Sequence, residues 1–99
     1  MKSKLTIEKL NKASKVLKCI AHPDRLRLVE CLEGRELSVN QLVRELKRDQ
    51  AVVSKHLAVL RNAGIVRSQV HKNFRYYSVA YRNVLNILAC MRTCKEITK

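Results

Sequence analysis

Residues 50–66 read QAVVSKHLAVLRNAGIV, and the rest of the chain is best understood outward from this segment. Apolar side chains recur in it at helical spacing, which predicts an amphipathic helix over residues 50–63. Three of them are expected to face inward: Val53, Leu57 and Leu60. Asp49 is a candidate N-cap, and Gly64 suits the left-handed conformation that commonly ends a helix.

Three further helices are predicted upstream. Residues 38–46 predict a short helix whose first turn is capped by the hydroxyl group of Ser38. Pro23 suits the first turn of a helix over residues 24–32, because its missing N–H is not needed there. Residues 5–20 predict a first amphipathic helix with lysines on its polar faces.

Downstream of residue 64 the hydrophobic period changes from about 3.6 to 2. Residues 65–70 and 75–79 are rich in β-branched and aromatic side chains and predict a β-hairpin, with Asn73 accepting a positive φ in the connection. Residues 81–97 return to helical spacing. The expected fold is mainly α with a small antiparallel β-hairpin, in the element order of a winged helix-turn-helix.

Chain length and charge indicate the number of domains and the kind of partner. The 99 residues fit a single domain, residues 1–99, with the helix-turn-helix at about 38–63 and the wing at about 65–79. The formal net charge is +13, and no Asp or Glu occurs from Gln50 to Lys95, which indicates a polyanionic partner, with nucleic acid the leading candidate. The longest apolar run has five residues, so we expect no membrane segment and a cytoplasmic location.

Four motifs resemble the ArsR/SmtB family of prokaryotic repressors. They are HPDRLRL (22–28), ELSVNQL (36–42), the segment 50–66 and YYSV (76–79). The resemblance covers nearly the whole chain. It implies a sequence-specific regulator that binds a double-stranded DNA operator.

The resemblance also implies a homodimer joined through the first and last helices, at about residues 5–20 and 81–97. Apolar stripes on these two segments exceed what the core of so small a domain needs, which favours burial against a second copy. Packing of the last helix within one chain is the alternative.

Polar residues on the outer face of the 50–63 helix are candidates for contact with base edges and phosphates. They are Gln50, Ser54, Lys55 and Arg61. His56 is a further candidate that either contacts phosphate, braces the helix or does neither. The wing carries four candidates for sequence-independent attraction: Arg67, His71, Lys72 and Arg75.

Four cysteines raise the question of an inducer: Cys19, Cys31, Cys90 and Cys94. Cys90 and Cys94 are spaced to share a helix face, where a soft metal or metalloid ion could bind if Cys19 supplied a third thiolate. Cys31 and Cys94 instead approximate the pair with which some relatives sense oxidants or reactive sulfur. Inert core cysteines are the third interpretation.

The sequence lacks the residues of the family's two familiar metal sites and the motifs of common enzyme sites. The family's metal box in the third helix reads Ser38-Val39-Asn40 here, without its cysteines, and residues 81–95 lack the Asp and His ligands of the site in the last helix. An enzyme is not expected, because no phosphate loop, nucleophile elbow or HExxH motif is present. The alternatives that stay open are a non-specific nucleic-acid-binding protein and a family regulator without a cysteine-based inducer.

Overall fold

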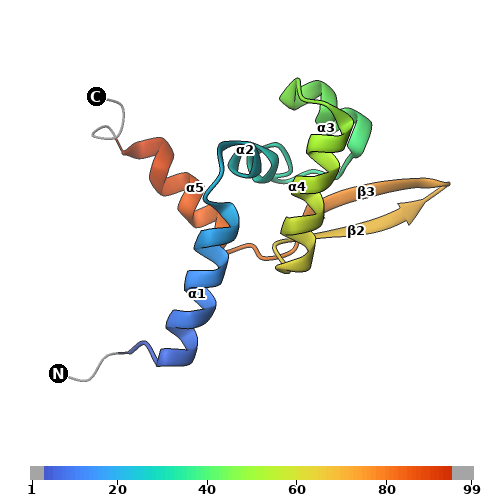
Figure 1. Cartoon of the computed structure of the whole chain (residues 1–99). Helices are drawn as coiled ribbons and strands as arrows, with labels where there is room; N and C mark the ends of the chain where they lie inside the picture. The colour runs from blue at the N-terminus through green and yellow to red at the C-terminus, as the bar shows by residue number, and fades with distance from the viewer. Residues whose placement is uncertain (1–3, 95–99) are drawn as a thin grey trace.

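The computed structural model describes residues 4–94 and consists of five helices and a three-stranded sheet (Figure 1). In chain order the elements are α1 (Ile7–Ile20), α2 (Pro23–Cys31), β1 (Leu37–Ser38), α3 (Val39–Leu46), α4 (Gln50–Asn62), β2 (Val66–His71), β3 (Phe74–Val79) and α5 (Val84–Thr93). The mainly α class with a small antiparallel hairpin is confirmed. The hairpin and the free end of α1 project at opposite ends of the molecule.

The core forms where α2, α3, α4 and the base of the sheet meet. Its fully buried side chains include Leu28 from α2, Leu42 from α3, and Val53, Leu57 and Leu60 from α4. The predicted inward face of residues 50–63 is therefore confirmed, and burial of this face fixes how α4 is turned relative to the rest of the domain.

The turn between α3 and α4 is built by local chemistry. Ser38 caps α3 in a complete capping box, in which its hydroxyl oxygen accepts from the backbone N–H of Gln41 and the Gln41 side chain accepts from the Ser38 N–H. Lys47 ends α3 in the left-handed conformation with φ of 56°. Asp49 occupies the N-cap position of α4, but its side chain makes no capping hydrogen bond.

The sheet differs from the prediction in two ways. The loop of the hairpin has only two residues, Lys72 and Asn73, both with positive φ, because His71 and Phe74 already pair across the strands. A third strand, β1, pairs antiparallel with β3 and places the sheet order at β1-β3-β2. Two residues are too few for a period-2 pattern, which is why the sequence did not reveal this strand.

The last helix is shorter than predicted. It begins at Val84 instead of residue 81, because the backbone N–H groups of Ala80 and Tyr81 both bond to the carbonyl oxygen of Ile65 and hold the chain in a turn. It ends at Thr93, since Cys94 has an extended ψ of 98°. Residues 95–97, which were also predicted to be helical, lie outside the described part of the chain.

The first helix begins at Ile7, two residues later than predicted, because the hydroxyl oxygen of Thr6 accepts from the N–H of Lys9 and caps it. Its C-terminal end packs into the core through Cys19 and Ile20. Among residues 4–94 there is no helix long and apolar enough to span a membrane.

Candidate DNA-binding interface

The outer face of α4 carries polar side chains in solvent. Gln50 starts the helix, Ser54 and Lys55 follow one turn later, and Arg61 lies in the last turn; all four are exposed. The opposite face is buried, so packing alone orients these side chains outward. The structure thus brings four of the predicted site residues onto one helix.

The hairpin of β2 and β3 carries the four predicted wing residues. Arg67, His71, Lys72 and Arg75 are all exposed. Cross-strand hydrogen bonds hold the two arginines on the ribbon: Arg67 Nε donates to Ser78 Oγ at 3.4 Å, and Arg75 Nη1 donates to Ser68 Oγ at 2.8 Å. Their guanidinium charges are therefore fixed on the wing.

The ionised side chains carried by α4, the wing and α5 have one sign of charge. The chain from Gln50 to Cys94, which includes α4, the wing and α5, contains no Asp or Glu. Three upstream acids pair with arginines away from α4: Glu45 with Arg35, and Glu30 and Glu33 with Arg92. The exposed face of α4 and the wing together form a cationic surface suited to a polyanion.

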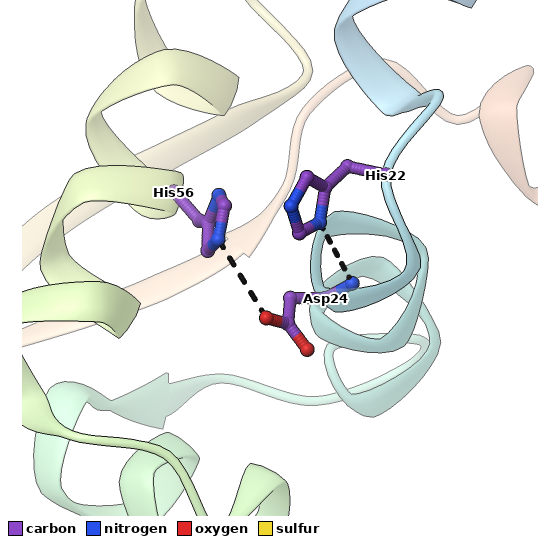
Figure 2. A group of neighbouring side chains, drawn as sticks. All are labelled: His22, Asp24 and His56. Atoms are coloured by element: carbon purple, nitrogen blue, oxygen red, sulfur yellow. Dashed lines mark hydrogen bonds and ion pairs between the residues drawn. The ribbon is translucent and has the colours of Figure 1, made fainter.

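His56 is the exception among the α4 candidates, because its side chain points inward. Only 7% of the residue is exposed. Arg25 Nε donates to His56 Nδ1 at 3.2 Å, and His56 Nε2 lies 3.7 Å from Asp24 Oδ2 (Figure 2). Burial lowers the pKa of His56, and the neighbouring His22 and Arg25 lower it further, so the ring is held neutral. These contacts agree with the bracing role among the alternatives for His56.

The residues around His56 form a polar network that the sequence did not reveal. Asp24 also accepts from Arg48 Nε through Oδ1 at 3.3 Å, and Arg25 Nη1 donates to the carbonyl oxygen of Cys19 at 2.9 Å. The network joins the start of α2 to α4, to the turn before α4 and to the end of α1. The only signal in the sequence was the placement of His56 on the inward stripe of its helix.

Arg25 is expected to stabilise this junction. We predict that Arg25→Ala lowers the free energy of unfolding by about 1–3 kcal/mol, because Nδ1 of the buried His56 loses its donor. Arg27→Ala is the matched control: Arg27 makes an exposed pair with Glu30 and should change stability by about 0.5 kcal/mol or less. Urea unfolding of both variants measures the difference, and equal effects would contradict a bracing role.

Comparison with known proteins identifies the chain. Residues 22–68 match the family model described as bacterial regulatory protein, arsR family. An uncharacterized HTH-type transcriptional regulator of Methanocaldococcus jannaschii is 31% identical over 83% of this chain and 93% of its own length. The chain belongs to the ArsR family.

Solved structures agree with this assignment to the ArsR family. HlyU of Vibrio cholerae superposes with a TM-score of 0.81 at 29% identity, covering 87% of this chain and 94% of that one. A second HlyU structure, of the reduced protein, superposes with a TM-score of 0.80 at 30% identity, covering 89% of this chain and 95% of that one. The transcriptional repressor PagR of Bacillus anthracis superposes with a TM-score of 0.78 at 30% identity, covering 87% of this chain and 99% of that one. The chain is therefore a transcriptional regulator with a winged helix-turn-helix fold, and its family consists of DNA-binding regulators and not of enzymes.

The cysteines of this ArsR-family regulator fall into two groups. Cys19 and Cys31 are buried, and desolvation raises the pKa of each thiol. Cys90 is exposed on α5, and Cys94 is half-buried directly after it. Residues 4–94 contain one group of three or more close potential metal ligands, and no cysteine belongs to it. Cys19, Cys90 and Cys94 therefore do not meet within one chain.

This grouping predicts an order of thiol reactivity. Iodoacetamide should modify Cys90 at least about tenfold faster than Cys19 or Cys31, because the two buried thiols are shielded and their raised pKa disfavours the thiolate. Peptide mapping by mass spectrometry along a time course gives the rates. In denaturant the differences should vanish, and native Cys31 reacting as fast as Cys90 would contradict the assignment.

Proposed function

We propose that this protein is a sequence-specific, DNA-binding transcriptional repressor that acts in the cytoplasm as a homodimer. The observation that carries the proposal is the orientation of α4. Its buried apolar face leaves Gln50, Ser54 and Lys55 on the outside, on a helix of a size that enters the major groove.

The residues divide into two roles. Gln50, Ser54 and Lys55 lie in the first two turns of α4 and read base edges, with Gln suited to adenine and Lys to guanine. Arg61, at the far end of the helix, contacts phosphate. Four polar or basic wing residues contact the neighbouring DNA backbone without reading sequence: Arg67, His71, Lys72 and Arg75.

These roles give opposite binding phenotypes. Gln50→Ala or Lys55→Ala should weaken binding to an operator duplex by about 1–3 kcal/mol and binding to random duplex much less. Lys72→Ala on the wing is the matched comparison and should weaken both duplexes alike while lowering the salt slope by about one counterion. Competition titrations at several salt concentrations measure both effects.

Two outcomes would count against this division of roles. Equal losses on both duplexes for Lys55→Ala would remove base reading from α4. A wild-type protein that binds operator, random duplex and single strands equally well would favour the alternative, a non-specific nucleic-acid-binding protein.

The homodimer rests on an apolar stripe that the chain does not bury itself. Leu10 and Leu17 of α1 are 46% and 52% exposed, and Met91 of α5 is 41% exposed. Leu88 of α5, by contrast, is only 6% exposed and packs in the core of its own chain. Packing within one chain therefore accounts for the burial of Leu88. It leaves Leu10, Leu17 and Met91 exposed, and we propose that a second copy of the chain covers them.

Leu17→Glu is expected to give a folded monomer. A carboxylate at a buried dimer contact would lack a partner, whereas the same side chain in the free monomer remains in solvent. Asn11→Glu, which adds an equal charge at another exposed position of α1, should remain dimeric. Sedimentation with circular dichroism checks association and folding together, and a wild type that is monomeric at micromolar concentration would contradict the proposal.

The inducer is proposed to act through Cys90 of α5 and Cys94 directly after this helix. Cys90 is open to reagents. Arg92 joins α5 to Glu30 of α2 and to Glu33 in the turn after α2, with its Nη2 3.4 Å and 2.9 Å from their carboxylates. Modification at Cys90 or Cys94 would shift α5 against the partner and change the separation of the two α4 helices. The related HlyU has been solved in a reduced form, which supports thiol oxidation as the signal; reactive sulfur and a soft ion such as As(III) are the other candidates.

Operator affinity with and without each reagent tests this mechanism. Polysulfide or As(III) should weaken operator binding by about 5- to 150-fold in the wild type. Cys90→Ser and Cys94→Ser should each reduce that response to the active reagent. Undiminished release of both variants would place the sensor elsewhere and leave these cysteines without a regulatory role.

A further inference from the structure

Three potential metal ligands meet between the start of α2 and α4: His22, Asp24 and His56 (Figure 2). One ligand atom from each lies within 4.8 Å of the other two, and this is the one such group among residues 4–94. His22 precedes α2, Asp24 lies in its first turn and His56 lies in the middle of α4. The group therefore spans two elements of the DNA-binding domain.

We propose that these three residues bind one divalent transition-metal ion such as Zn²⁺ or Co²⁺. The ligands are Nε2 of His22, Oδ2 of Asp24 and Nε2 of His56, with water completing the coordination. Two imidazoles and one carboxylate suit Zn²⁺, Co²⁺ or Ni²⁺, whereas Mg²⁺ and Ca²⁺ prefer oxygen ligands alone.

The separations are close to those that a metal ion requires. Ligand atoms about 2.0–2.1 Å from a tetrahedral ion lie about 3.3 Å from one another. His56 Nε2 and Asp24 Oδ2 already lie 3.7 Å apart, and the three ligand atoms all lie within 4.8 Å of one another. Small side-chain rotations would close the remaining gap, and Asp24 would keep its Oδ1 contact with Arg48.

The hydrogen bonds show what metal binding would change. His56 Nδ1 accepts from Arg25, and His22 Nδ1 accepts from the backbone N–H of Asp24. A ring nitrogen that accepts a hydrogen bond carries no proton, so the N–H of each ring is at Nε2. An ion bound at Nε2 moves that proton to Nδ1, so Arg25 must leave His56 and α2 must lose its His22 cap.

The surrounding charges define the selectivity of the site. Arg25 and Arg48 lie against it and repel any cation. An ion that binds imidazole nitrogen weakly cannot offset this repulsion by coordination. An ion that binds imidazole nitrogen strongly can. Zn²⁺ and Co²⁺ should therefore bind, and Mg²⁺ should not compete with them.

Co²⁺ binding to the purified full chain tests the proposal. In a Cys90→Ser/Cys94→Ser background, equilibrium dialysis should give one Co²⁺ per chain, with visible d–d bands and no sulfur-to-cobalt charge-transfer band. His22→Gln should lower the affinity by at least about tenfold, whereas His71→Gln, on the exposed wing, should leave it unchanged. His22 is preferred to the buried His56 because its replacement disturbs the core less.

Histidine tautomers give a second readout that a merely structural role would not move. Long-range ¹H–¹⁵N spectra should show both rings protonated at Nε2 without metal and at Nδ1 with Zn²⁺. Unchanged tautomers, no binding of either ion, or equal Co²⁺ affinity in His22→Gln would overturn the proposal. All of these measurements are made without DNA, so their failure leaves the proposed regulator function untouched.

Discussion

Burial of one face of α4 positions both the proposed DNA-reading side chains and the polar network around His56. Val53, Leu57 and Leu60 are fully buried against α2, α3 and the base of the sheet. Each residue turns a helix by about 100°, so a shift of one position would drive Ser54 or Arg61 into this core. In comparable cores, replacing a buried leucine by alanine lowers the free energy of unfolding by about 2–5 kcal/mol. Packing of this strength is enough to hold α4 in a single orientation.

The same packing gives His56 its place in the structure. Its position beside Leu57 sends it inward, where an unpaired imidazole would be costly. Arg25 donates to Nδ1, Asp24 Oδ2 lies 3.7 Å from Nε2, and Arg48 links Asp24 to the turn that precedes α4. Apolar packing and the polar network therefore fix the same helix from two sides, and this leaves its outer face as a rigid platform.

Local signals predicted much of the fold because they act within a few residues. The capping box at Ser38 and the positive φ values at Gly64 and Asn73 follow from side-chain chemistry at one position. The exposed face of α4 followed from helical periodicity in the same way. The boundaries of α5 did not, because the bonds that delay its start come from Ile65, about fifteen residues upstream. The His56 network was hidden for the same reason: Arg25 and His56 lie 31 residues apart in sequence.

Intermolecular nuclear Overhauser effects between α4 and DNA test most directly the claim that the outer face of α4 reads sequence. The duplex would be one that the protein itself selects from a random pool. The account predicts contacts from the side chains of Gln50, Ser54 and Lys55 to base protons in the major groove, with contacts from the wing limited to sugar protons. Base contacts confined to the wing or to α3, with none from α4, would contradict it.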